Sequence, residues 1–111
     1  MKKLSEMFKE VVEARKTREC KVEHPEWSPM DDVVVKSFIP DALRRVYWHT
    51  KRGALREAYI AAGEALPRIR YEPFMWRLPE QMRVSRDVIV STVELLQMAE
   101  EARGKWLAAV R

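Results

Sequence analysis

Hydrophobic residues near the start of the chain recur at the spacing of an amphipathic helix. They occupy positions i, i+3, i+4, i+7 and i+8, with charged residues between them: Leu4, Met7, Phe8, Val11 and Val12. This pattern predicts a helix over residues 3–19 with one apolar face. That face is expected either to pack on the rest of the fold or to dock on a partner or a membrane surface.

The next stretch, residues 20–28, contains Pro25, is followed directly by Pro29 and shows no periodic pattern, which predicts an extended connector. Residues 28–31 then place a serine at an N-cap, a proline at the first helical position and an acidic residue in the first turn. A short helix over residues 29–38 is therefore expected, although its run of three valines also fits a strand. We expect Pro40 to end or kink this helix, because a proline disfavours the helical conformation of the residue before it.

Residues 41–65 contain no proline and predict one long helix. Its apolar face is made largely of small side chains, which lets another helix approach closely: Leu43, Tyr47, Thr50, Ala54, Ala58, Ala61 and Ala65. The opposite side carries a continuous basic stripe: Arg45, His49, Arg52 and Arg56. Gly53 would loosen the helix midway, at a cost of about 1 kcal/mol relative to alanine.

The last third of the chain divides into an arm and a helix. Residues 67–79 hold three prolines, three aromatic residues and three arginines without any period, which predicts an extended arm ordered by contact with its own helices or with a partner. Residues 80–110 predict a C-terminal helix that is apolar on two sides in its first half. That half would lie at the centre of the core or between the core and another protein.

These elements predict one all-α domain spanning residues 1–111. We expect three to four helices joined by proline-rich extended segments, and not a closed compact bundle. The arm and the doubly apolar last helix would lack enough cover from their own chain, so the isolated protein is expected to be helical but poorly folded.

Composition narrows the class of protein. The chain has 111 residues, of which 47% are hydrophobic and 34% charged, and its net charge is +4. This composition excludes simple disorder, and no apolar run approaches the roughly 18 residues that a membrane-spanning helix needs. A single cysteine, Cys20, allows no intramolecular disulfide and favours a reducing compartment. The start of the chain has no apolar segment typical of a secretory signal, and it is too acidic for a cleavable mitochondrial presequence.

Few residues suggest chemistry. His24 and His49 lie in different predicted elements, and together with Cys20 they show no metal-ligand spacing. The three glycines are too scattered to form a phosphate-binding loop. The adjacent carboxylates Asp31 and Asp32 fit the first turn of a helix better than a catalytic pair. We therefore expect a protein that is not an enzyme and has no catalytic, metal-binding or cofactor-binding residues and no cofactor.

The basic stripe and the arm are the features that predict binding. We expect their arginine and aromatic side chains to contact a partner: Arg45, Arg52, Arg56, Arg68, Arg70, Tyr71, Phe74, Trp76 and Arg77. These residue types are typical of protein interfaces, but they also bind anionic lipid head groups, or RNA through phosphates and stacked bases. A solvated helix face with a self-packed arm is the remaining interpretation. A protein surface is favoured, because a net charge of +4 is modest for a nucleic-acid binder.

The order of features over residues 30–106 resembles a known family. An aspartate pair at residues 31–32 precedes an Ile-Pro-Asp turn, a basic helix with Lys-Arg-Gly-Ala-Leu at 51–55, a Leu-Pro pair at 66–67 and a charged tail. This order resembles the small matrix-side subunit of the mitochondrial cytochrome bc1 complex. The resemblance implies a non-catalytic accessory subunit of this respiratory complex, bound peripherally to the matrix side of the inner membrane, with other subunits as partners. The alternative is an RNA-associated accessory subunit, such as a mitochondrial ribosomal protein.

Overall fold

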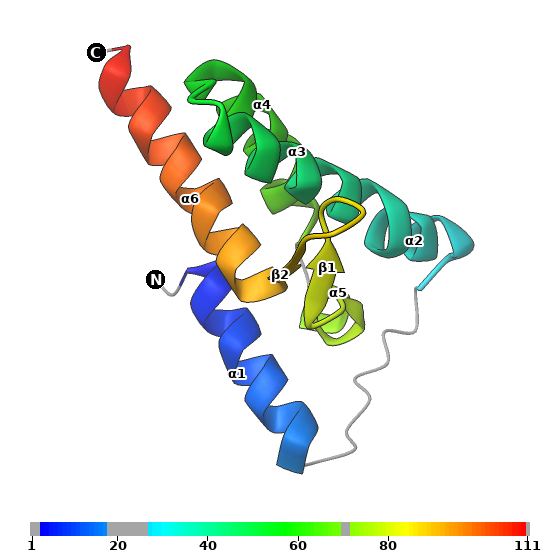
Figure 1. Ribbon diagram of the computed structural model, residues 1–111. Coiled ribbons are helices and arrows are strands. Elements are labelled where there is room, and N and C mark those ends of the chain that lie inside the picture. Colours follow the sequence, from blue (N-terminus) through cyan, green and yellow to red (C-terminus); the bar gives the residue numbers. More distant parts are fainter. Residues whose placement is uncertain (1–2, 18–26, 70–71, 111) are drawn as a thin grey trace.

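Helices and one small hairpin make up the part of the chain that the structure describes, residues 3–17, 27–69 and 72–110 of a computed structural model (Figure 1). The three helices α3, α4 and α6 pack against one another, and α1 and α5 cover one end of this group. Among the described residues, no helix has both the length and the apolar character needed to cross a membrane.

The first helix, α1 (Leu4–Thr17), packs its apolar face on its own chain. Phe8 is fully buried, and Val11 and Val12 are nearly so. The backbone N–H and the hydroxyl of Ser5 both donate hydrogen bonds of 2.9 Å to the carboxylate of Glu100 on α6. The predicted stripe is therefore confirmed, and packing within the fold accounts for it. Residues 18–19 of the predicted helix and most of the predicted connector, residues 20–26, lie outside the described residues.

The second helical segment runs through Pro40 without a break. It comprises α2 (Pro29–Val33), a π-helical turn (Val34–Phe38) and α3 (Ile39–Lys51), and Ser28 caps it as its sequence predicts. The prediction that Pro40 ends the helix is wrong. In the π turn the N–H of Ile39 bonds to the carbonyl of Val34, five residues back, so the turn before the proline is wider than an α turn. We attribute the tolerance of Pro40 to this widening, which relieves the clash between a proline ring and the preceding turn.

The break that the sequence placed at Pro40 occurs at Gly53 instead. Gly53 has φ +72°, a left-handed conformation that glycine adopts without strain, and α4 (Leu55–Ala65) starts two residues later. The predicted single helix over residues 41–65 is therefore two helices that fold back on each other. The small residues do serve close packing: Ala58, Ala61, Ala62 and Ala65 are all buried.

The predicted arm is not extended. It forms a 3-10 turn (Leu66–Arg68) and a short helix α5 (Glu72–Arg77), each with a proline in its second position. A proline near the start of a helix interrupts no helical hydrogen bond, because the first N–H groups have no partner in the helix. A proline-rich segment therefore allows two short helical turns here.

The C-terminal helix is shorter than its pattern predicts. Strands β1 (Gln81–Arg83) and β2 (Ile89–Ser91) form an antiparallel hairpin with Met82 opposite Val90, and α6 (Thr92–Ala109) begins only after it. Met82, Val84 and Val90 are buried, so alternate residues of the hairpin face the core in place of one side of a long helix. The Thr92 hydroxyl donates to the carbonyl of Pro79 at 2.5 Å, which ties the start of α6 to the start of the hairpin.

The predicted fold class, all-α and not a closed compact bundle, is wrong. The molecule is a compact globule; 77% of its described residues are helical, and they form five helical segments when α2 to α3 count as one, together with a small hairpin. Its radius of gyration is 14.2 Å, close to the value of about 13 Å expected for a compact chain of 100 residues. An extended arm would leave the core uncovered, whereas α5 and the hairpin cover it, and the sequence pattern predicts neither of these elements.

Candidate functional site

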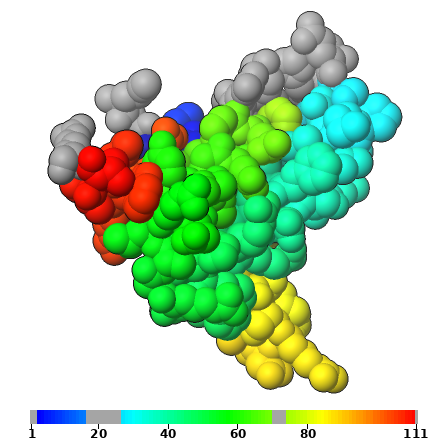
Figure 2. All heavy atoms as spheres, turned by 90° about the horizontal axis from the view of Figure 1, so that it is seen from above, coloured from blue at the N-terminus to red at the C-terminus, as the bar shows by residue number. Residues whose placement is uncertain are grey.

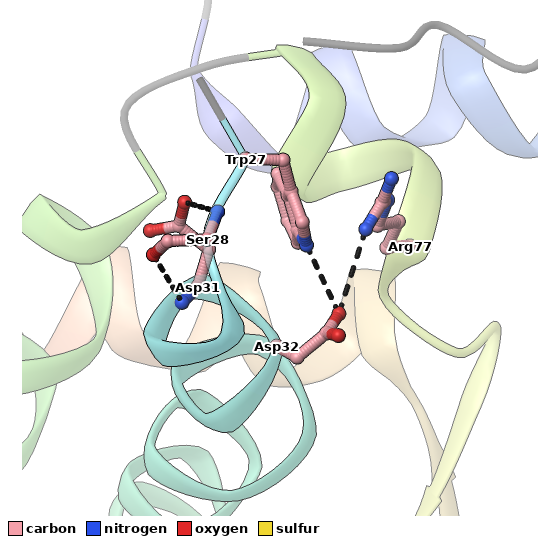
Figure 3. A network of polar contacts seen from close by, with 5 residues as sticks. All are labelled: Trp27, Ser28, Asp31, Asp32 and Arg77. Carbon is pink, nitrogen blue, oxygen red and sulfur yellow. Dashed lines mark hydrogen bonds and ion pairs between the residues drawn. The ribbon is translucent and has the colours of Figure 1, made fainter. Parts of the chain in front are cut away.

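Two of the predicted partner residues pack against their own chain at the start of α2. The indole N–H of Trp27 donates to Asp32 Oδ1 at 3.0 Å, and Arg77 Nη1 reaches the same oxygen at 3.4 Å (Figure 3). The guanidinium of Arg77 also lies 3.7 Å from the centre of the Trp27 ring. The centre of the Phe74 ring lies 5.0 Å from that of the Trp27 ring, with the two planes tilted by 50°. This cluster fastens α5 to α2, so the contacts of Phe74 and Arg77 are internal.

The basic stripe is divided by the turn at Gly53. Arg45 makes ion pairs with Asp41 at 3.5 Å and with Glu64 at 2.6 Å, and thereby links α3 to α4. Arg52 caps the end of α3, and Arg56 lies in the first turn of α4; both are exposed. The three arginines therefore do not form a row along one helix.

Of the remaining predicted partner residues, the structure describes Arg68 and Trp76. Arg68 donates a hydrogen bond to the carbonyl of Glu64. Arg70 and Tyr71 lie outside the described residues. Trp76 is half-buried and lines a groove of about 280 Å³ together with Met75 and the α1 residues Met7, Glu10, Val11 and Ala14.

Arg15 holds the two sides of this groove together. Its Nη2 donates to the carbonyl of Met75 at 2.6 Å, and its guanidinium lies 5.5 Å from the centre of the Phe8 ring. Burial lowers the pKa of Arg15 from its usual value, and the negative charge of Glu80 partly opposes this. Arginine ordinarily titrates so far above neutrality that its charge persists.

A second pocket, of about 360 Å³, lies where the hairpin meets the helix that leads from α2 to α3. We call it the hairpin-base pocket. Its lining contains four cationic side chains and no carboxylate: Val35, Lys36, Pro40, Arg44, Arg77, Pro79, Gln81, Met82 and Arg83. Such a lining suits an anion.

Hydrogen bonds to backbone carbonyls hold the hairpin against α3. Arg44 Nε donates to the carbonyl of Arg83 at 2.7 Å, and the indole N–H of Trp48 donates to that of Val84 at 2.7 Å. Arg83 Nη1 donates to the carbonyl of Arg86 at 2.6 Å across the turn. The hairpin and its turn, drawn in yellow in Figure 2, project from the body of the molecule.

The sequence pattern does not single out Lys36, Arg44, Arg83 or Arg86 as binding residues. It places Arg83 and Arg86 in the predicted C-terminal helix over residues 80–110. The alternation of apolar residues at 82, 84 and 90 around a short polar turn is the signal that could have revealed the hairpin.

Within the described part of the chain, no group of three or more His, Cys, Asp or Glu residues is arranged to hold a metal ion. The absence of an enzymatic activity stays a prediction. No family model matches the chain, and no match was found to a curated protein or to a solved structure. Function is therefore argued from the geometry of the chain.

Proposed function

We propose that this protein is a non-catalytic subunit that docks on a larger protein assembly through one apolar helix face. The apolar helix face consists of Met30, Val33 and Phe38, whose exposed fractions are 61%, 42% and 49%. Large apolar side chains exposed together are typical of interaction sites, and Phe and Met are enriched in the buried centres of protein interfaces. This exposure is the observation that carries the proposal.

The π turn aligns these three residues. Met30 and Val33 are three residues apart and therefore share a side of α2. In an α-helix of 3.6 residues per turn, Phe38 would point well away from Val33, which precedes it by five residues. In a π turn the backbone hydrogen bond joins residues five apart, which brings Phe38 closer to the side of the helix that carries Val33 than an α turn would. π turns are frequently found at functional sites.

The segment that carries the apolar helix face is held rigidly. Ser28 and Asp31 form a reciprocal capping box at its start, and Val35, Ile39 and Pro40 on its other side are buried. A rigid face loses little conformational entropy when it binds, which favours docking as a preformed surface.

The identity of the assembly is proposed from the family resemblance alone. That resemblance points to the cytochrome bc1 complex, on the matrix side of the mitochondrial inner membrane and peripheral to it. In this setting the protein would carry no redox group, and its partners would be neighbouring protein subunits, with anionic lipid as an additional contact at the membrane surface.

A charge placed in the apolar helix face tests the proposal. Phe38→Glu should remove the chain from its native complex, because a carboxylate buried in an apolar interface is strongly unfavourable. Ile60→Glu is the matched control, since Ile60 is exposed to 46% on α4 and lies outside this face. The readout is native electrophoresis of the tagged full-length protein, with mass spectrometry of the band that contains it.

The proposal predicts that the wild type and Ile60→Glu migrate with a large complex and that Phe38→Glu migrates alone. Haem-bearing membrane proteins in the same band would identify the respiratory complex. A wild-type chain that migrates alone, or equal loss of the complex in both variants, would show that the apolar helix face is not a docking surface.

A further inference from the structure

We infer that the hairpin-base pocket binds a nucleotide unit of single-stranded RNA, with the phosphate on its cationic side chains and the sugar and base on its apolar wall. This inference is independent of the proposed docking function. It uses a different side of the helical segment, since Lys36 lines the pocket while Val33 and Phe38 belong to the apolar helix face.

The first argument is uncompensated charge. Arg77 is paired with Asp32, but within the described residues no carboxylate forms an ion pair with Lys36, Arg44 or Arg83. Of the acidic residues on neighbouring elements, Asp41 pairs with Arg45 and Glu80 acts on Arg15, while Asp87 lies exposed in the hairpin turn and does not line the pocket. Like charges that converge on one pocket repel one another, and a bound anion would relieve this repulsion.

The second argument is that the arginines are already oriented. Arg44 uses its Nε to hold the carbonyl of Arg83, so both of its terminal amino groups remain as donors. Arg83 uses one terminal nitrogen to hold the carbonyl of Arg86 and keeps its other donors. Planar guanidinium groups fixed in this way suit the oxygens of a phosphate, and little side-chain entropy is lost on binding.

The third argument concerns size and polarity. A volume of about 360 Å³ lies at the small end of the range of about 300–1,000 Å³ for ligand pockets, which suits one nucleotide and not a duplex. Val35, Pro40, Pro79 and Met82 form the apolar wall of the pocket; Pro79 is exposed and the other three are buried, so a sugar and base would pack chiefly against the ring of Pro79. Gln81 adds an amide that can both donate to and accept from a ribose hydroxyl, the group that distinguishes RNA from DNA.

A strand fits better than a free nucleotide or an acidic peptide. Arg86 is exposed on the hairpin turn and does not line the pocket, so it can meet the phosphate of a neighbouring nucleotide. A single strand of RNA carries one phosphate on every nucleotide. Successive phosphates can therefore contact the cations that line the pocket and then Arg86 on the hairpin turn. The carboxylates of an acidic peptide would bind the cations, but such a peptide has no sugar and base that could pack on the apolar wall.

Binding of a labelled short single-stranded RNA to the full-length protein, measured by fluorescence anisotropy, tests the inference. Lys36→Glu should weaken binding roughly tenfold or more and reduce the dependence of affinity on salt, because a phosphate contact is lost. Lys105→Glu on α6 makes the same change in net charge at an exposed residue outside the pocket, and it should leave affinity within about twofold. Circular dichroism of both variants checks that the fold is intact.

Competition experiments distinguish the possible ligands. Unlabelled RNA should displace the probe at far lower concentrations than adenosine monophosphate, single-stranded DNA of the same sequence, polyglutamate or anionic lipid vesicles.

Equal weakening of RNA binding by Lys36→Glu and Lys105→Glu would mean that only net charge matters, and it would overturn the inference. Displacement by any of the other four competitors as effectively as by RNA would also overturn it. Phe38→Glu should bind RNA like the wild type, which separates this result from the docking proposal.

Discussion

At the scale of single residues, the predicted partner contacts are distinguished by what they touch. Arg77 and Phe74 pack on Trp27, and Arg45 bridges α3 and α4, whereas Arg52 and Arg56 remain exposed. Arginine and aromatic side chains attract each other in the same way within a chain and between chains. Residue type alone therefore indicates that a contact exists, but not which molecule supplies it.

The contacts of Arg77 should contribute measurably to stability. Arg77→Ala removes the cation–π contact with Trp27 and the partly exposed ion pair with Asp32, and we expect the free energy of unfolding to fall by about 1–2 kcal/mol. Arg103→Ala, at an exposed position of α6, should change it by less than about 0.5 kcal/mol. Urea unfolding followed by circular dichroism measures both values. Equal effects would mean that the cluster of Figure 3 contributes nothing beyond an exposed charge.

At the scale of elements, two local backbone features decide where the helices run. The π turn before Pro40 lets one helical segment continue from Pro29 to Lys51. The left-handed conformation of Gly53 ends that segment and lets α4 turn back on α3. Proline and glycine are the residues that most often end or interrupt helices, but whether either of them does so depends on the backbone conformation of the adjacent turn.

Alanine substitutions at two glycines should change stability in opposite directions. Gly53→Ala should lower the free energy of unfolding by about 1–2 kcal/mol, because its φ of +72° is strained for a residue with a side chain, although no atom lies within 4 Å of the added Cβ. Gly63→Ala, inside α4 and equally unobstructed, should raise it by about 0.5–1 kcal/mol through better helix propensity. Thermal and urea unfolding of both variants gives the comparison. A stabilising Gly53→Ala would contradict the left-handed turn.

At the scale of the whole molecule, the apolar faces of the helices are covered by the same chain. Leu95 and Leu96 of α6, Leu43 of α3 and Phe8 of α1 belong to one continuous buried core. The expectation of insufficient cover from the chain itself is therefore wrong for the described residues. A proposed subunit of this kind would fold first and then dock as a preformed body.

The isolated protein should accordingly unfold in one cooperative transition, with far-UV and near-UV circular dichroism changing together on heating. Leu95→Ala should lower the free energy of unfolding by about 2–5 kcal/mol, because Leu95 is fully buried. Leu107→Ala on the same helix should cost less than about 1 kcal/mol, since Leu107 is 43% exposed. Early loss of the near-UV signal alone would indicate a loosely packed state and contradict the compact core.

Part of the fold and little of the proposed sites could be predicted from the sequence. The stripe of α1, the cap at Ser28 and the close packing through the alanines of α4 depend on residues near one another in the chain, and the structure has all three. The hairpin was missed because apolar residues at 82, 84, 88 and 89 fit a helical period as well as strand alternation. Lys36, Arg44 and Arg83 could not be grouped, because they are distant in sequence and meet only where the hairpin rests on α3.

The amino-acid order alone determined that this chain is predominantly helical, where its first helix lies, and which residues could bear charge or bury apolar surface. These properties follow from local periodicity, capping and side-chain chemistry, which act over a few residues. Tertiary structure decided that Pro40 stays within a helix, that Gly53 ends one, and that cations from α3 and the hairpin share a pocket. Each of these outcomes depends on packing between segments far apart in the chain, and packing between distant segments overrides local preference when it buries more surface.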